Sequence, residues 1–310
     1  MKWIKKGLIY CPKGNFNWNI SHAQIPLAYI VDNETIRVYY STRDVHNRSY
    51  LSYVELETED PKKIKYVHNL PILELGKIGE FDDSGVMPSC IIEQNKQIYL
   101  YYTGWNVGVN VHYRLAIGLA ISNDNGMTFS KFSNGPILDR SIYDPCLSAS
   151  PSVLFENGIW RMWYISGTKW ELINNEPEPF YHIKYAESID GITWNRNGLV
   201  CLDYDSFTEG ISRPCIIRDK NTYFLFYSYR NNFNYRTNKE STYRIGYAKS
   251  DDGLTWERDD KKIGLTFSEN GWDSQMLAYP NVIVWNNRKY MFYNGNGFGK
   301  TGFGYAVLEE

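Results

Sequence analysis

Carboxylates recur in the sequence shortly before regularly spaced prolines. Cleavage of a glycosidic bond needs one group to protonate the leaving oxygen and another to activate water or attack the anomeric carbon, and carboxylates usually fill both roles. The candidates are Asp82 and Asp83 before Pro88, Asp144 before Pro151, Glu209 before Pro214 and Asp273 before Pro280, while Ser21 and His22 precede Pro26. These side chains could act together only if the fold brings them to one place.

The same prolines mark an internal repeat. They lie 62, 63, 63 and 66 residues apart, and similar runs begin at each of them: PLAYIV, PSCIIE, PSVLFE, PCIIRD and PNVIVW. Further apolar runs follow in each unit, separated by short turns rich in Asn, Asp and Gly, which are typical of β-hairpins. The aromatic content is 16%. Together these features predict an all-β fold, a five-bladed β-propeller with four antiparallel strands per blade.

The two ends of the chain complement one another. The last unit stops after its third strand, at VLEE, and the N-terminal WIKKGLIYC reads like the missing fourth strand. Pairing of the two ends would complete one blade, close the ring and leave no open sheet edge. We therefore expect a single domain over residues 1–310, with blades at about 12–75, 76–138, 139–202, 203–265, and 266–310 plus 1–11.

Loop lengths distinguish the two faces of the expected ring. The connections between second and third strands, at 106–114, 171–181 and 231–242, are long, and the other turns are short. The first strands begin on the face of the long loops, where binding sites concentrate. We therefore predict that acids from four units converge at the mouth of a central channel. The predicted catalytic residues are Glu209, Asp83, Asp273 and Asp144, with Asp82 assigned to a turn.

An alternative is that each of these acids only caps a turn, because Asp is a common turn residue. The recurrence of the acids at one position of the repeat, while their neighbours vary, favours the catalytic interpretation.

Aromatic and polar residues near the strand tips would share this face. Trp and Tyr stack on sugar rings, and Arg and Asn donate hydrogen bonds to hydroxyl, carboxylate or phosphate groups. The predicted substrate-binding residues are His22, Arg43, Trp105, Trp170, Arg213, Tyr227, Arg230 and Asn294. For the aromatic residues the alternative is packing between blades. For His22 the alternatives are a base, a hydrogen-bond donor to substrate, or a satisfied core histidine.

Arg213 stands inside a predicted first strand, immediately before Pro214. A buried guanidinium without a partner is costly, so we expect either a carboxylate such as Glu209 or a ligand anion to neutralise it.

Three turns carry a different aspartate motif. The stretches SNDNGMTF, SIDGITW and SDDGLTW resemble the Asp-box hairpin of sialidases and related propellers. Their aspartates, Asp124, Asp190 and Asp252, fall in short turns on the face opposite the long loops. We expect them to be structural, with Trp194 and Trp256 packed between blades.

Composition narrows the partners and the compartment. A net charge of -2 with well-mixed charges favours neither nucleic acid nor an anionic membrane. The five cysteines form no CxxC pair, so neither a disulfide framework nor a zinc site is predicted. The N-terminus has no signal-peptide pattern, which indicates a cytoplasmic protein that meets small substrates. Oligomeric state is not determined by the sequence.

The chain resembles the five-bladed propeller glycosidases of families 43, 32, 62, 117 and 130. More closely, SHAQIP, RVYYSTRD, FDDSGVMPS, SRPC and YMFYNGNGFGKTGFGYAVLE resemble a group of uncharacterised bacterial glycosidase-like proteins of surface-polysaccharide loci. The resemblance to family 43 implies that Glu209, in its EG context, is the general acid and that Asp83 or Asp144 tunes its pKa. Ser21 and His22 stand where family 43 has the Asp that acts as the general base. The resemblance therefore carries over the architecture and not a particular activity.

The leading hypothesis is an enzyme that acts at the anomeric centre of a small carbohydrate, with an anionic or nucleotide-linked one favoured by the arginines. Glu209 would be the acid, and Asp83 or Asp273 the base or nucleophile. The alternatives are a sugar phosphorylase, a carbohydrate-binding propeller without turnover, and a metal-dependent nucleotidase. No cofactor is predicted, although a calcium ion in the central channel would suit the last alternative.

Overall fold

The structure is a computed structural model that describes residues 1–309, and it is almost entirely β. One 3-10 turn, η1 (Asp260–Ile263), and one four-residue helix, α1 (Asn296–Gly299), are the helical elements of this part of the chain. The predicted all-β class is confirmed. The strands are β1 (Trp3–Tyr10), β2 (Ser21–Ile30), β3 (Thr35–Arg43), β4 (Ser49–Glu57), β5 (Ile64–Val67), β6 (Gly85–Gln94), β7 (Gln97–Val107), β8 (Tyr113–Ser122), β9 (Ser130–Lys131), β10 (Ser148–Glu156), β11 (Ile159–Ile173), β12 (Glu176–Ser188), β13 (Val200–Leu202), β14 (Glu209–Asp219), β15 (Thr222–Asn231), β16 (Arg244–Ser250), β17 (Glu257–Arg258), β18 (Ala278–Trp285), β19 (Arg288–Asn294) and β20 (Phe303–Leu308).

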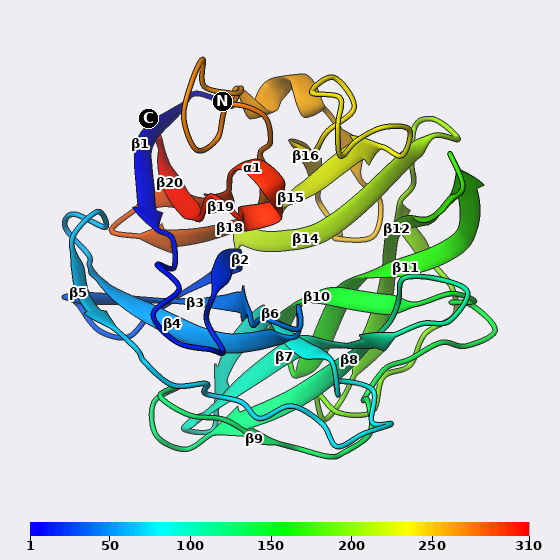
Figure 1. Ribbon diagram of the computed structural model, residues 1–310, viewed down its shortest axis with the longest axis horizontal. Helices are drawn as coiled ribbons and strands as arrows, with labels where there is room; N and C mark the ends of the chain where they lie inside the picture. The colour runs from blue at the N-terminus through cyan, green and yellow to red at the C-terminus, as the bar shows by residue number, and fades with distance from the viewer. Residues whose placement is uncertain (310) are drawn as a thin grey trace.

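The strands form antiparallel sheets that follow the sequence repeat (Figure 1). Three sheets have four strands each, in the orders β10-β11-β12-β13, β14-β15-β16-β17 and β1-β20-β19-β18. A larger sheet contains two repeats, β2-β3-β4 with β5 and β6-β7-β8-β9, joined by the single parallel pair Ser49–Gly85. The expected pairing of the chain ends occurs, since β1 runs antiparallel to β20 from Trp3–Leu308 to Tyr10–Phe303. The result is a propeller-like arrangement, and the count of five blades stays a prediction.

The first strand of each repeat lies innermost, and these five strands line one central cavity. An innermost strand is a sheet edge, so its N–H groups need partners outside its own sheet. Side chains from the neighbouring repeat supply several of them. Val153 N donates to Cys90 Sγ (3.3 Å), Ile216 N to Ser152 Oγ (2.9 Å), Val282 N to Cys215 Sγ (3.2 Å) and Ala28 N to Asn281 Oδ1 (2.8 Å).

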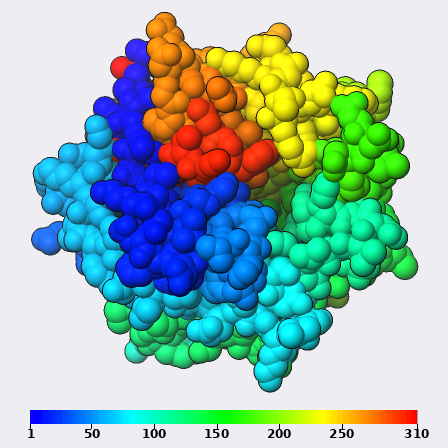
Figure 2. All heavy atoms as spheres, viewed as in Figure 1, coloured from blue at the N-terminus to red at the C-terminus, as the bar shows by residue number. Residues whose placement is uncertain are grey.

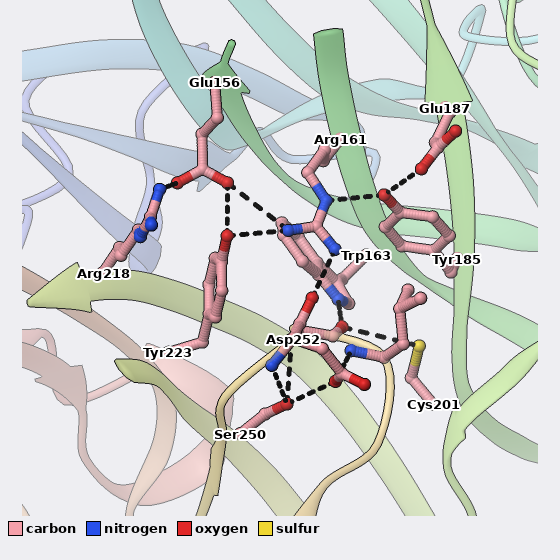
Figure 3. A network of polar contacts seen from close by, with 12 residues as sticks. Glu156, Arg161, Trp163, Tyr185, Glu187, Cys201, Arg218, Tyr223, Ser250 and Asp252 are labelled. Carbon is pink, nitrogen blue, oxygen red and sulfur yellow. Dashed lines mark hydrogen bonds and ion pairs between the residues drawn. The ribbon is translucent and has the colours of Figure 1, made fainter. Parts of the chain in front are cut away.

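The three aspartate turns hold neighbouring repeats together. Asp252 Oδ1 accepts hydrogen bonds from the backbone N–H groups of Leu254 and Thr255, which lower the pKa of Asp252 to about 2. The carbonyl of Gly253 in this turn accepts the indole N–H of Trp163 from the preceding repeat (2.6 Å; Figure 3). In the other two aspartate turns, the hydroxyl of Tyr101 donates to the carbonyl of Gly191, and the hydroxyl of Tyr39 donates to that of Gly126 (2.8 Å each). The structural interpretation of Asp124, Asp190 and Asp252 is therefore confirmed.

Candidate functional site

The face on which the inner strands begin is less loop-rich than expected. Residues 171–181 form the extended end of the β11–β12 hairpin, paired as far as Ile173–Glu176, and Asn106 pairs with Arg114 across β7 and β8. Of the three connections expected to be long loops, the one between β15 and β16 (232–243) is the one that the structure shows as a loop. Two of the three expected loops are hairpins because their residues continue the strand pairing instead of ending it. Figure 2 shows this face with the beginning of the chain (blue), its end (red) and middle segments (green) meeting around the centre.

Asp144, one of the predicted catalytic acids, is fully buried inside its own sheet. Its carboxylate lies 2.9 Å from Arg196 Nη1 and 3.7 Å from Lys184 Nζ, and it accepts the hydroxyl of Tyr164 (3.1 Å). Ser141 adds a further hydrogen bond (3.0 Å). The carboxylate of Asp144 is thus part of a buried ion pair with Arg196 and Lys184.

The same arrangement recurs in two other repeats. Each contains a buried Asp, a Tyr 20 residues later in the second strand, and a cation from the outer strand or, for Arg196, from the segment before it. We call these three groups the acid–tyrosine–cation clusters. They are Asp82 with Tyr102 (2.9 Å) and Lys131 (2.7 Å), Asp144 with Tyr164 and Arg196, and Asp273 with Tyr293 (2.9 Å) and Lys5 (2.6 Å). The recurrence of acids in the sequence therefore has a structural cause, because each one ties the segment before an inner strand to the second strand and to the outer part of the same repeat.

Glu209 belongs to a fourth, enlarged cluster. Arg258 binds both of its carboxylate oxygens (2.8 and 2.7 Å), and the backbone N–H of Asp205 adds a third hydrogen bond (2.8 Å). Arg258 also pairs with Asp260, the acceptor for the hydroxyl of Tyr227. Tyr227, predicted to bind substrate, is fully buried in this cluster.

The structure places Asp83, and not Asp82, in the turn before β6. Asp82 is the buried member of a cluster, whereas Asp83 is half-buried and accepts hydrogen bonds from Gly79 N (2.9 Å) and Ser84 Oγ (2.8 Å). Asp83 therefore closes the turn that the sequence assigned to Asp82. The two carboxylates alternate in direction along the chain, and the sequence alone does not decide which of them turns inward.

The four predicted catalytic acids thus have different partners in different repeats, and none of their contacts joins one acid to another. A catalytic role for Glu209, Asp83, Asp273 or Asp144 stays a prediction.

Arginine and tyrosine side chains converge where the acids were expected. Arg230 is 3% exposed, and its guanidinium lies 3.5 Å from the ring centre of Tyr235, 5.1 Å from that of Tyr243 and 5.4 Å from that of Tyr181. The hydroxyls of Tyr181 and Tyr243 are 2.8 Å apart. Arg230 donates to Asn232 Oδ1 (3.1 Å) and Pro179 O (3.4 Å), both uncharged acceptors.

Tyr279 links this group to the first two repeats. Burial raises its pKa well above the usual value, as do Tyr243 and Tyr113, whereas the positive charges of Arg230 and Arg43 act to lower it. Its phenol therefore lies within electrostatic range of both arginines. Arg43 itself donates to Gln24 Oε1 (3.0 Å) and to Asn47, and its guanidinium lies 5.8 Å from the ring centre of Trp105.

His22 completes the set from the first repeat. Its Nδ1 lies 2.8 Å from Ser21 Oγ. Burial, and then the positive charges of Arg43 and Lys300, lower the pKa of His22 to about 4. The imidazole is therefore neutral at pH 7 and can accept a proton or a hydrogen bond. We call His22, Arg43, Tyr113, Tyr181, Arg230, Tyr243 and Tyr279 the mouth cluster.

The charge of the mouth cluster is not balanced by acids within it. Within residues 1–309, no ion pair joins Arg43 or Arg230 to a carboxylate, and burial and neighbouring tyrosines are the main causes of the pKa shifts of both arginines. A buried carboxylate nearby, Glu178, is bound by Arg236 and by the hydroxyl of Tyr235 (3.0 Å). The cluster therefore favours a ligand with negative charge and hydroxyl groups.

Backbone strain surrounds this site. Ile25, Ser150, Arg213 and Tyr279 each stand directly before a proline and have left-handed backbone angles, with φ between 49° and 56°. All five inner strands also carry a register shift at this level, a position at which β-bulges re-aim side chains. Second-strand side chains of adjacent repeats hold three of the strained N–H groups, Ile25 by Asn294 (2.6 Å), Ser150 by Thr103 (2.9 Å) and Tyr279 by Ser228 (2.7 Å).

Of three remaining predicted binding residues, one packs against the mouth cluster and the others form structural hydrogen bonds. Trp170 is half-buried and meets Tyr113 of the mouth cluster edge-on, with ring centres 5.3 Å apart. Trp105 donates its indole N–H to Ser49 Oγ (2.5 Å). Asn294 is fully buried, and its amide binds Ile25 N, Ala23 O and Gly302 O, so it is engaged in holding the backbone.

Sequence reasoning missed the tyrosines of the mouth cluster. Tyr113 begins β8, Tyr243 directly precedes β16, Tyr181 lies five residues into β12, and Tyr279 directly precedes Pro280. This placement was a usable signal, although the 26 tyrosines of the chain obscure it.

No helix within residues 1–309 is long and apolar enough to cross a membrane. No group of three or more His, Cys, Asp or Glu side chains in this part of the chain could hold a metal ion.

The fold is that of glycoside hydrolase-like propellers. A solved glycoside hydrolase superposes with a TM-score of 0.74, at 16% identity over 98% of this chain and 90% of its own. A putative glycoside hydrolase from Bacteroides ovatus superposes with a TM-score of 0.73, at 17% identity over 100% and 97%. A member of glycoside hydrolase family 130, a family described as mannoside phosphorylases that contains hydrolases of β-1,2 mannosidic linkages, gives a TM-score of 0.72, at 17% identity over 99% and 93%.

Sequence comparison identifies the family. The chain is 37% identical to the uncharacterized protein MT1551 and 36% identical to the uncharacterized protein Rv1502, both from Mycobacterium tuberculosis, over the full length of each. It belongs to the family of these two proteins. A β-1,2-mannobiose phosphorylase of Thermoanaerobacter sp. is 33% identical over 96 residues, 29% of this chain and 31% of the relative. No family model matches the chain.

Proposed function

We propose that this protein is a glycosyl-acting enzyme that takes a small anionic carbohydrate at the mouth cluster. The scaffold would be a single domain of five blades over residues 1–310, closed by the pairing of β1 with β20. The observation that carries the proposal is that Arg43 and Arg230 both lie within electrostatic range of Tyr279 and that neither forms an ion pair with a carboxylate of residues 1–309.

The residue types of the mouth cluster suit such a ligand. Arg43 and Arg230 would bind a phosphate or carboxylate group, and the tyrosine hydroxyls would meet sugar hydroxyls. Trp170, beside Tyr113, offers an aromatic face for a sugar ring. A phosphosugar, a sugar nucleotide or an acidic oligosaccharide fits this description, and a neutral one leaves the arginines unpaired.

His22 and Glu209 are the groups we assign to proton transfer. His22 has a pKa lowered to about 4, so it is unprotonated at neutral pH and has a nitrogen free to accept a proton. Glu209 is retained from the sequence as the acid, a role in which Arg258 would have to release one carboxylate oxygen. The partial similarity to a β-1,2-mannobiose phosphorylase makes phosphorolysis a variant, with phosphate in place of water.

A second candidate function is carbohydrate binding without turnover. It is favoured by the ion pairs that engage Glu209, Asp144 and Asp273, because a carboxylate held by a cation is not free to meet a substrate.

The test is a thermal-shift screen of the wild type against sugar phosphates, sugar nucleotides, uronic acid oligosaccharides and neutral oligosaccharides, followed by NMR of each ligand that binds. We expect stabilisation by an anionic class and its slow conversion, lost in Glu209→Gln and His22→Gln while binding remains. Binding without any conversion by the wild type supports the second function instead. A preference for neutral sugars contradicts the proposal, and conversion that depends on calcium and stops with chelator would favour a nucleotidase.

A further inference from the structure

The five inner strands also line a space whose lining residues include none of the mouth cluster. It is a cavity of about 330 Å³ lined by residues of β2, β6, β10, β14 and β18 that follow the repeated prolines. Apolar side chains such as Leu27, Ile91, Val153 and Val282 form much of its wall. Arg213 is the one charged residue that lines it.

Arg213 is 1% exposed, and only part of its guanidinium is satisfied by the protein. Nη1 donates to the carbonyl of Ser89 (2.7 Å). Within residues 1–309, neither Nε nor Nη2 has an acceptor at hydrogen-bonding distance. These two nitrogens lie on the same edge of the planar group, and their parallel N–H bonds match two oxygens of one carboxylate or phosphate.

Within residues 1–309, no ion pair neutralises this guanidinium. Glu209, the partner expected from the same strand, is turned away and bound by Arg258. Cys90 and Cys215 are the titratable groups that affect Arg213, and burial raises the pKa of both thiols, that of Cys90 to about 11. Both are therefore neutral at pH 7. Burial also lowers the pKa of Arg213, which reflects a charged form without compensation.

Apolar walls make such a site selective. A buried charge without a partner is strongly unfavourable, and the pairing of opposite charges is stronger in a medium of low polarity than in water. The backbone of Arg213 is itself left-handed, with φ of 54°, and it directly precedes Pro214. A β-branched or bulky residue rarely adopts this conformation, and such strain is typical of functional positions.

We propose that this axial cavity is an oxyanion site in which Arg213 binds one phosphate or carboxylate group through Nε and Nη2. The proposal does not depend on the function proposed for the mouth cluster, because none of the residues that line the cavity belongs to that cluster. The oxyanion is either free inorganic phosphate or the acidic group of a carbohydrate, since both present two oxygens with the same spacing.

The test compares the wild type with Arg213→Met and Arg213→Lys in phosphate-free buffer, followed by titration with inorganic phosphate and, separately, with a sugar phosphate. We expect phosphate to raise the unfolding temperature of the wild type by several degrees and to leave that of Arg213→Met unchanged. Arg213→Lys, which keeps the charge and loses the fork, should bind phosphate about 10-fold more weakly. Without ligand, Arg213→Met should be at least as stable as the wild type, because a buried unpaired charge is removed.

Matched controls separate this site from the mouth. Cys215→Ser, which alters the same cavity without changing charge, and Arg43→Gln, in the mouth cluster, should keep the response to phosphate. A response to the sugar phosphate alone, lost in Arg213→Met, identifies the carbohydrate as the source of the oxyanion. The proposal is overturned if neither ligand stabilises the wild type, or if Arg213→Met responds as strongly as the wild type. Loss of carbohydrate binding in Arg43→Gln with phosphate binding intact would concern the mouth cluster alone.

Discussion

The acid–tyrosine–cation clusters and the mouth cluster use the same residue types and balance their charge in opposite ways. In the clusters, every buried carboxylate has a cation within ion-pair distance and a tyrosine hydroxyl on one oxygen. In the mouth cluster, Arg43 and Arg230 have tyrosines around them and no carboxylate bound. Charge that is paired inside one sheet stabilises the fold, whereas charge left unpaired between repeats is available to a ligand.

Loss of a guanidinium should separate the two regions most clearly. Arg258→Met leaves Glu209 and Asp260 buried without their cation, and should lower the free energy of unfolding by about 3–5 kcal/mol. Arg230→Met leaves no carboxylate behind and loses mainly its contact with Tyr235, which we expect to lower it by about 1–2 kcal/mol. Urea unfolding of both variants measures the difference, and equal losses would contradict the comparison.

Ligand binding should show the reverse order for the same two variants. Arg230→Met should weaken binding of an anionic carbohydrate by about 10- to 100-fold, while Arg258→Met keeps wild-type affinity if it folds. Calorimetric titration with the strongest ligand of the thermal-shift screen provides the measurement.

Asp144→Asn tests whether a cluster acid is structural. The amide still accepts the hydroxyl of Tyr164, but Arg196 and Lys184 lose their counter-charge, so the unfolding free energy should fall by about 3 kcal/mol. A variant that unfolds like the wild type but loses turnover would instead restore the catalytic prediction for this residue.

The free energy of unfolding should fall between about pH 6.5 and pH 4 because of His22 in the mouth cluster. Because the pKa of His22 is about 4 when folded and near 6.5 when unfolded, the unfolded state takes up the proton first, and stability is lost as pH falls from about 6.5 to 4. His22 is partly exposed, so the loss is about 1–2 kcal/mol. Unfolding free energies at pH 7 and pH 4.5 should differ more in the wild type than in His22→Gln, and identical pH dependence would refute the assignment.

The smallest effect is expected at Asp83. Asp83→Asn keeps the side-chain oxygen that accepts Gly79 N, so stability should change by less than about 1 kcal/mol. Turnover abolished in this stable variant would show that Asp83, and not only the mouth cluster, belongs to the catalytic site.

Much of the architecture could be predicted because the signals of the repeat lie in short stretches of sequence. The alternation of apolar runs with Asn- and Gly-containing turns indicated strands, and the order of the runs indicated which strands pair. The turn role of Asp252 was also predictable, since its hydrogen bonds go to Leu254 and Thr255, two and three residues further on. The lengths of the loops could not be predicted in the same way, because residues 171–181 continue a hairpin whose pairing depends on a neighbouring strand.

The sequence by itself determined the all-β class, the period of the repeat, the structural turns and the complementary ends of the chain, all of which depend on near neighbours or on a repeated pattern. Only the tertiary structure decided which charges are paired. Lys5 forms an ion pair with Asp273, 268 residues away, and Arg258 forms one with Glu209, 49 residues away. Arg43, Arg213 and Arg230 have no such acidic partner among residues 1–309. The physical reason is that adjacent residues of a strand point to opposite sides, so a shift of one position or one bulge decides whether a carboxylate faces its own sheet or the central channel.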